Sequence, residues 1–218
     1  MVLKKTVKLL FTGDSITDCG RNNPAYQPLG NGYVYFAAYA LMAKYPDLEI
    51  QIINTGISGN TSTQLLNRWK TDCTDYKADI ITILIGINDL WRRYEKDKVS
   101  EAVYPEQFEA NYRQMIQMVL NSCKSDIIII EPFMFCNDKN NDMFKELKHY
   151  QKICAKLATE YNITLLNLQS EIDSLSACVS SEKWSADMVH PNLWAHCWIS
   201  QRWNDTVFGK IKKYIIKG

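Results

Sequence analysis

Short runs of consecutive apolar residues alternate along this chain with longer stretches in which apolar residues recur every three or four positions. The runs predict four strands and a weaker fifth, at residues 7–11, 49–54, 79–86, 126–132 and 163–168. The longer stretches predict amphipathic helices at residues 33–44, 105–122 and 142–160. Strands that are apolar at consecutive positions are buried on both faces, and regular alternation with helices produces a parallel sheet between two helical layers. The pattern therefore predicts an α/β protein, a three-layer α/β/α sandwich with a parallel sheet.

No internal repeat, low-complexity tract or long linker interrupts this alternation. We therefore expect one domain spanning residues 1–218. A chain of this length can bury roughly 70% of the surface that it exposes when unfolded. Its apolar content of 46% is that of a globular protein and excludes a disordered chain.

The charges of the chain almost cancel, because 25 Lys and Arg residues face 24 Asp and Glu residues. Binding to nucleic acid or to anionic lipid would need a basic face, so we expect neither as a partner. The apolar runs are far shorter than the about 20 residues of a membrane span, so we expect no contact with a membrane. The N-terminus interleaves lysines with apolar residues, which is typical of a strand and not of a signal peptide. Seven cysteines without a CxxC motif suit reduced thiols, and we expect a cytoplasmic protein.

Polar loops follow the first three predicted strands, at residues 12–18, 54–60 and 86–89. Ligands of open parallel sheets bind at the carboxyl ends of the strands, so these loops should converge on one site. Ser15 stands where the first strand turns into a helix. Its N–H is then an unpaired donor at the positive end of the helix dipole, where an oxyanion would be stabilised.

A carboxylate and an imidazole lie three residues apart near the end of the chain, at Asp187 and His190. Pro191 favours an extended backbone at His190 and a good start for a closing helix at about 192–208. A hydroxyl, a base and an orienting carboxylate form the triad arrangement of acyl transfer. His190 would take the proton of Ser15 and return it to the leaving alcohol, while Asp187 fixes the tautomer of the imidazole.

Acyl transfer also needs donors that point toward the tetrahedral oxygen. The candidates for this oxyanion hole are the N–H groups of Ser15 and Gly59 and the side-chain amide of Asn88. Each has a structural alternative, because Ser15 could be a helix N-cap, Gly59 a turn residue and Asn88 a brace for its loop. Asp187 could be an acceptor for backbone amides, but its position three residues before the only histidine followed by a proline favours the orienting role.

Four blocks of this sequence, FTGDSITDCG, NTGISGNT, IGIND and DMVHPN, together resemble the SGNH or GDSL hydrolases. That family carries Ser, Gly, Asn and His in this order. The resemblance implies a flavodoxin-like fold with Ser15 as nucleophile, Gly59 and Asn88 as oxyanion donors, and the pair of Asp187 and His190 as base. The longer strings GDSITDCGR, GISGNT and IGINDLWR, with Arg68 and its neighbouring tryptophan, are similar to cytoplasmic acetylesterases that deacetylate xylo-oligosaccharides.

The other histidines do not suggest a metal site. His149 lies among lysines on a predicted solvated helix, and His196 is expected to be packed or exposed on the final helix. No histidine pair, and no histidine with a cysteine or carboxylate, has the spacing of metal ligands. We therefore predict that the protein needs no metal and no cofactor.

Polar and aromatic residues beside the motifs point to a small acylated carbohydrate as substrate. Asp14 lies next to the nucleophile, and Trp91 and Trp184 border the expected cleft, where flat aromatic faces could stack on a sugar ring. These three residues are the candidates for substrate binding. Trp194 and Trp203 on the final helix are expected to pack, although its aromatic character also permits a homo-oligomer.

Three other functions compete with this interpretation. The same machinery could serve a lipase or thioesterase of longer acyl chains, since the sequence does not define the walls of an acyl pocket. A flavin or phosphate binder is disfavoured because Asp14 and Asp18 would repel the anion and the glycine-rich phosphate motifs are absent. A non-catalytic carbohydrate-binding protein would leave Ser15, Asp187 and His190 without a joint purpose.

Overall fold

The computed structural model describes residues 6–215, which form one parallel sheet with helices on both faces. The strands lie in the order β2-β1-β3-β4-β5, and every neighbouring pair is parallel. Their bounds are β1 (Thr6–Gly13), β2 (Glu49–Asn54), β3 (Ile80–Leu84), β4 (Asp126–Ile130) and β5 (Thr164–Leu166). This is the flavodoxin-like strand order, so the predicted fold class is confirmed.

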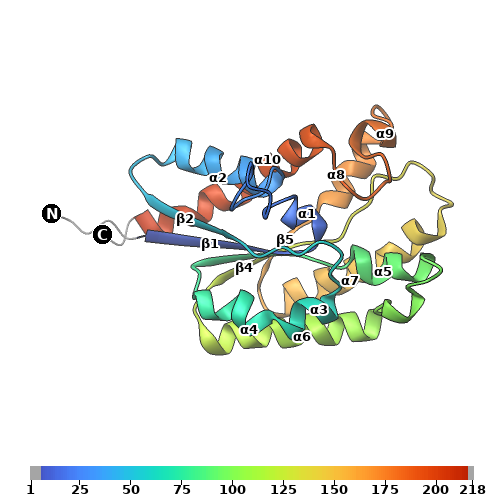
Figure 1. The fold of residues 1–218 in the computed structure, drawn as a ribbon, viewed down its shortest axis with the longest axis horizontal. Coiled ribbons are helices and arrows are strands. Elements are labelled where there is room, and N and C mark those ends of the chain that lie inside the picture. The colour runs from blue at the N-terminus through green and yellow to red at the C-terminus, as the bar shows by residue number, and fades with distance from the viewer. Residues whose placement is uncertain (1–5, 216–218) are drawn as a thin grey trace.

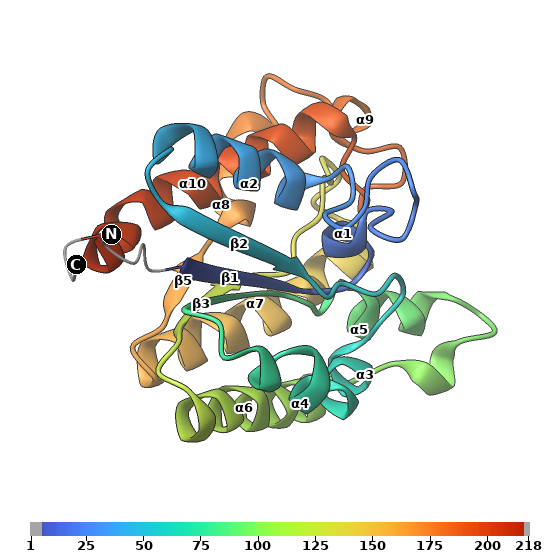
Figure 2. The same ribbon diagram turned by 60° about the vertical axis from the view of Figure 1, so that its left-hand side comes forward.

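The helices occupy the connections between strands. They are α1 (Ser15–Asp18), α2 (Tyr33–Lys44), α3 (Ser62–Asn67), α4 (Trp69–Asp72), α5 (Ile87–Trp91), α6 (Pro105–Ser122), α7 (Asp142–Glu160), α8 (Leu168–Leu175), α9 (Ser181–Trp184) and α10 (Leu193–Ile215), with 3-10 turns η1 (Thr74–Tyr76), η2 (Arg92–Tyr94) and η3 (Val99–Glu101). Helices α2 and α10 cover one face of the sheet, and α6 and α7 cover the other (Figure 1). The turned view in Figure 2 shows the same two layers.

Helices α2, α6 and α7 begin and end at the predicted residues, and local signals mark the starts of α6 and α7. Pro105 occupies the first turn of α6, and the side chain of Asn141 accepts a hydrogen bond from the N–H of Phe144 to cap α7. The closing helix differs from its prediction, since it continues to Ile215 and not to about residue 208. Val207 and Ile211 are fully buried on it, so the apolar face continues for another turn and stabilises the extension.

Three predicted strands end earlier than expected. β5 ends at Leu166, because Asn167 already caps α8, and backbone features end the other two. β3 ends at Leu84, shortly before Gly86 adopts a φ of 133°. β4 ends at Ile130, two residues before Pro132, which has no N–H to donate. These early ends leave the residues that follow free to form the loops at the carboxyl edge of the sheet.

Tryptophans of opposite layers pack against the sheet with their polar atoms satisfied. Trp203 of α10 packs on Phe11 with ring centroids 4.8 Å apart, and its Nε1 donates to the hydroxyl of Thr82 at 2.9 Å. On the other face, Nε1 of the buried Trp69 donates to the carbonyl of Met115 at 3.0 Å. The packing predicted for Trp203 is therefore confirmed. Trp194 only partly follows its prediction, since 45% of it stays exposed.

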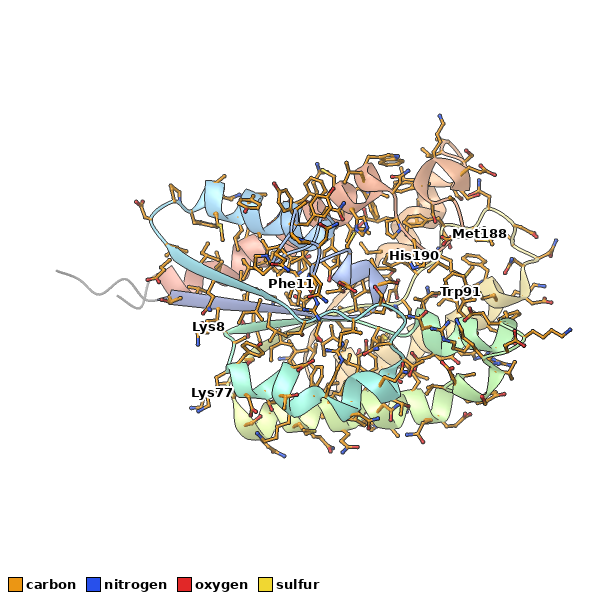
Figure 3. The ribbon with its side chains drawn as sticks, viewed as in Figure 1. Lys8, Phe11, Lys77, Trp91, Met188 and His190 are labelled. Atoms are coloured by element: carbon orange, nitrogen blue, oxygen red, sulfur yellow. The ribbon has the colours of Figure 1, made fainter. Side chains whose placement is uncertain are left out.

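Within residues 6–215, no helix combines the length and the apolar character that a membrane span requires. The seven cysteines form no disulfide bond. The two ends of the sheet differ in their side chains: Lys8 and Lys77 lie at the amino end, whereas Trp91, Met188 and His190 gather at the carboxyl end (Figure 3). The carboxyl end is the one at which the sequence predicts the site.

Candidate active site

Ser15 is placed by a sharp turn between the first strand and a helix of only four residues. β1 ends at Gly13, where a Cβ would lie 2.0 Å from the carbonyl oxygen of Leu84, so only glycine fits this approach to β3. Asp14 caps α1, and its Oδ1 accepts from the N–H of Ile16 at 3.0 Å. The cap is thus Asp14 and not Ser15, which is the first residue of the helix. The N–H of Ser15 therefore has no partner within the helix.

The structure brings Ser15, His190 and Asp187 into one hydrogen-bonded row. The Ser15 Oγ lies 2.8 Å from Nε2 of His190, although 175 residues separate them in the chain. The Nδ1 of His190 lies 2.7 Å from Oδ2 of Asp187. In the neutral imidazole with its proton on Nδ1, the Nδ1–H donates a hydrogen bond to the carboxylate. Nε2 then has a lone pair directed at the serine hydroxyl. This is the arrangement of a general base and its nucleophile.

The loop that carries the base is folded around the Asp187 carboxylate. Its Oδ1 accepts from the backbone N–H groups of Val189 at 3.0 Å and His190 at 2.8 Å, and from the hydroxyl of Ser185 at 2.9 Å. Met188, between Asp187 and Val189, adopts a φ of 67°, which is uncommon for a residue with a side chain. Its carbonyl accepts from the N–H of Phe135 at 2.8 Å, so the loop after β4 holds the turn from outside.

These hydrogen bonds also fix the charge of Asp187. Partial burial by itself would raise the pKa of its carboxyl, but the hydrogen bonds from His190, Val189 and Ser185 together lower the pKa to about 2. The carboxylate is therefore ionised at neutral pH. Its Oδ2 faces Nδ1 of the imidazole and would stabilise a positive charge on the ring. Oδ2 makes the ring contact that the orienting role requires, whereas Oδ1 accepts the backbone amides of the alternative interpretation.

The two remaining candidates for the oxyanion hole lie on neighbouring loops. Gly59 has a φ of 82°, and the Nη2 of Arg92 donates to its carbonyl at 3.0 Å. Among the described residues, no acceptor takes the N–H of Gly59. The Nδ2 of Asn88 donates to the carbonyl of Asn60 at 3.0 Å, which uses one of its two amide hydrogens. Asn88 thus braces the loop, and its second amide N–H has no acceptor among the described residues.

Two of the three predicted substrate-binding residues are wrong on grounds of burial. Asp14 is completely buried with its carboxyl turned into the protein, and desolvation raises its pKa to about 7. Trp184 is only 2% exposed, and its ring packs on Phe135 and Trp194 with centroids 5.3 and 4.3 Å away. Position beside a motif does not fix the direction of a side chain. Both side chains are therefore buried and not available to a substrate.

Trp91 is the predicted substrate-binding residue that does border the site. It is half-buried at the end of α5, and its ring centroid lies 5.7 Å from that of His190 (Figure 3). The ring is therefore beside the base, with part of its surface open to solvent. Of the other histidines, His149 is exposed and His196 is packed, its Nδ1 accepting from the N–H of Tyr33 at 3.1 Å.

The sequence analysis missed the residues that hold the Gly59 loop in place. The Oδ2 of Asp18 accepts from both the N–H and the hydroxyl of Ser58, at 3.0 and 2.6 Å. Arg92 holds the carbonyl of Gly59 from the other side. Arg68, which the sequence analysis noted only as part of a string, also reaches this loop. These contacts could have been suspected from the sequence, because Asp18, Arg68 and Arg92 are charged residues in or beside the motif strings and had no assigned role there.

Comparisons with known proteins agree on one family. The sequence matches the GDSL-like Lipase/Acylhydrolase family over residues 11–196. An acetylxylan esterase of Geobacillus stearothermophilus is 36% identical over 194 residues, which cover 87% of this chain and 88% of that protein. The crystal structure of Axe2, an acetylxylan esterase from the same organism, superimposes with a TM-score of 0.87 at 33% identity, covering 95% of this chain and 96% of that one.

Further solved structures are also similar. LAE5, an alpha/beta hydrolase enzyme from the metagenome of Lake Arreo, has a TM-score of 0.86 at 27% identity and covers 93% of this chain and 95% of its own. Three of the similar structures are catalytic mutants of Axe2, in which a serine, an aspartate or a histidine is replaced by alanine.

Proposed function

Because this chain belongs to the GDSL-like lipase/acylhydrolase family and is therefore a carboxylic ester hydrolase, we propose that it removes acetyl groups from carbohydrates such as acetylated xylo-oligosaccharides. The observation that carries the proposal is the continuous row of Asp187, His190 and Ser15, with contacts of 2.7 and 2.8 Å. The catalytic mutants of Axe2 concern the same three residue types, which supports these roles.

Acylation begins when Nε2 of His190 takes the proton of Ser15 and the serine oxygen attacks the acetyl carbonyl. The oxyanion of the tetrahedral intermediate accepts from the N–H groups of Ser15 and Gly59 and from the second amide hydrogen of Asn88. When the intermediate collapses, the ester bond breaks and His190 gives its proton to the departing sugar oxygen. The acetyl group is left on Ser15 and the deacetylated sugar hydroxyl is released.

Deacylation repeats these steps with water as the nucleophile. His190 takes a proton from the water as the water oxygen attacks the acetyl-serine, and returns the proton to the Ser15 oxygen as acetic acid leaves; the acid then ionises to acetate in solution. In both halves the imidazolium is transient and faces the ionised Asp187. Removing a single oxyanion donor commonly lowers kcat by about 100- to 1000-fold, so the three donors account for a large part of the expected rate.

The carbohydrate part of the proposal rests on the relative and on Trp91. The similar curated protein is an acetylxylan esterase. Trp91 offers a flat, partly exposed ring beside His190, against which a sugar ring can lie. The free thiols of the chain suit a reducing compartment, and we propose a cytoplasmic location in which short xylo-oligosaccharides are deacetylated.

The test is the hydrolysis of 4-nitrophenyl acetate, butyrate and octanoate by wild type and by Ser15→Ala, with acetylated xylose as a competitor. We expect acetate to be the fastest ester, acetylated xylose to compete, and Ser15→Ala to be inactive. A preference for octanoate would retain the serine mechanism and refute the acetyl specificity. A wild-type protein without turnover of any ester would refute the proposal as a whole.

A further inference from the structure

The guanidinium of Arg68 lies between the loops that carry the proposed catalytic groups. Arg68 follows α3, and only 14% of its side chain is exposed. Its Nη2 donates to the carbonyl of Gly13 at 3.1 Å, its Nη1 to the carbonyl of Thr55 at 2.6 Å, and its Nε to the side-chain oxygen of Asn60 at 2.9 Å. One planar group therefore contacts the last residue of β1 and both ends of the loop after β2.

These contacts join the segments that carry the three oxyanion donors. Gly13 lies two residues before Ser15, and Asn60 directly follows Gly59. The backbone carbonyl of Asn60 in turn accepts from Asn88 at 3.0 Å. Moving the guanidinium would therefore change the spacing between the N–H groups of Ser15 and Gly59 and the amide of Asn88.

We propose that Arg68 is a positioning residue that sets the geometry of the oxyanion hole by clamping the end of β1, two residues before Ser15, to the loop after β2 that carries Gly59. The proposal rests on the serine esterase activity proposed above. Arg68 touches no substrate in this role. It acts through the carbonyl groups of Gly13 and Thr55 and the side chain of Asn60.

An arginine suits this role because its five N–H donors point outward from one rigid plane and can serve several oxygens in different directions. A lysine has a compact ammonium on a flexible side chain, so it keeps the charge but not the planar set of N–H donors. Asp72, one helical turn later, pairs with Nη1 of Arg68 at 2.8 Å. This ion pair compensates the enclosed charge and holds the guanidinium in one orientation.

Other contacts keep the two loops associated without Arg68, so its replacement should alter their spacing and leave the fold intact. The N–H of Ile57 donates to the carbonyl of Gly13 at 3.0 Å. The carboxylate of Asp18 accepts from the backbone N–H and from the hydroxyl of Ser58. We therefore expect a partial loss of activity, and a displacement of about 1 Å at a catalytic group can lower the rate by on the order of 100-fold.

The experiment compares wild type with Arg68→Lys. It measures kcat and KM on 4-nitrophenyl acetate and the Ki of a small boronic acid that forms a tetrahedral adduct with Ser15. We expect kcat/KM to fall about 10- to 100-fold and the Ki to rise by a similar factor, with KM nearly unchanged. A merely structural role would reduce the amount of folded enzyme, which lowers the rate but leaves the Ki as it is.

The matched control is Arg113→Lys. Arg113 is also ion-paired and partly buried, but it lies on α6, where it contacts Glu109, Glu160 and Tyr161. The Ki of the boronic acid for Arg113→Lys should equal its Ki for wild type. If Arg68→Lys gives the same Ki as this control, the clamp is refuted.

A second variant decides the case in which Arg68→Lys does not fold. Asn60→Ala removes only the acceptor of the Arg68 Nε, and its Ki should rise several-fold while the fold survives. An unchanged Ki in Asn60→Ala refutes the clamp. Failure of the proposed function looks different, because wild type itself would then neither hydrolyse esters nor bind the boronic acid.

Discussion

Asp187 holds His190 through two separate hydrogen bonds, one to the ring and one to the backbone. Its Oδ2 lies 2.7 Å from Nδ1 of the imidazole, and its Oδ1 accepts from the N–H of His190 at 2.8 Å. The spacing of three residues lets a single carboxylate make both bonds. The same group therefore shapes the loop and orients the base, and the two roles can be separated by substitution.

Asp187→Asn should abolish most of the activity and preserve the loop. The amide oxygen can still accept from the N–H groups of Val189 and His190, but the amide nitrogen would face Nδ1 and favour the wrong tautomer of the imidazole. We expect kcat to fall about 10⁴-fold with little change in the circular dichroism spectrum. A near-normal kcat on 4-nitrophenyl acetate would remove Asp187 from the mechanism.

Asp14→Asn should flatten the dependence of stability on pH. Desolvation raises the pKa of the buried Asp14 carboxyl from 3.8 to about 7 in the folded protein. Between about pH 4 and pH 7 the unfolded chain therefore loses this proton first, so ionisation favours unfolding and the free energy of unfolding falls as the pH rises. The contribution of Asp14 to this fall is on the order of 1–4 kcal/mol. An asparagine can keep the cap on Ile16 but does not ionise.

Urea denaturation of wild type and Asp14→Asn at pH 5 and pH 8 measures this effect. The loss of stability between the two pH values should be smaller in the variant. Asp205→Asn is the control, because Asp205 has a side chain that is 70% exposed and should leave the wild-type dependence unchanged. Equal pH dependence in Asp14→Asn and wild type would contradict the prediction.

Gly59→Ala should impair turnover more than stability. The φ of 82° strains any residue with a Cβ by about 1–2 kcal/mol, and the new Cβ would lie 3.2 Å from Nη2 of Arg92. The backbone N–H would shift away from the oxyanion, so we expect kcat on 4-nitrophenyl acetate to fall at least about 10-fold. Unaltered kcat would argue against an oxyanion role for Gly59.

Gly209→Ala provides the comparison for this substitution. Gly209 lies within α10, and a Cβ there would meet no atom within 4 Å. Alanine should stabilise the helix by about 1 kcal/mol and raise the Tm, without any effect on kcat.

Trp91→Ala should weaken substrate binding, whereas Trp184→Ala should lower the stability of the fold. Trp91 is half-buried beside His190, so its loss should raise the KM for acetylated xylo-oligosaccharides about 3- to 10-fold and change the Tm little. Trp184 is buried among aromatic rings, so its loss should lower the free energy of unfolding by about 3–5 kcal/mol. Calorimetry and substrate titration of both variants distinguish the two roles, and an unchanged KM in Trp91→Ala would exclude Trp91 from the binding site.

The amino-acid pattern was enough to predict the type and place of most of the long elements. Helices α6 and α7 repeat their apolar residues over three or more turns, and the runs of β3 and β4 are apolar on consecutive positions, so burial is encoded locally there. Helix α2 is apolar at nearly every position and β2 alternates polar with apolar residues, so their buried faces depend on the neighbouring elements. The sequence also indicated Ser15, Asp187 and His190, because the chemistry of acyl transfer demands these residue types and a rule of parallel sheets puts such loops at one edge.

Which side chains beside the motifs face the site depends on how distant segments pack together. Asp14 and Trp184 stand as close to the motifs in the chain as Trp91 does, yet both are buried. The direction of Trp184 depends on Phe135 and Trp194, which come from other segments. The contacts of Arg68 likewise join loops that are brought together by folding. Periodicity records which face of an element is buried, whereas these directions follow from packing between residues far apart in the sequence.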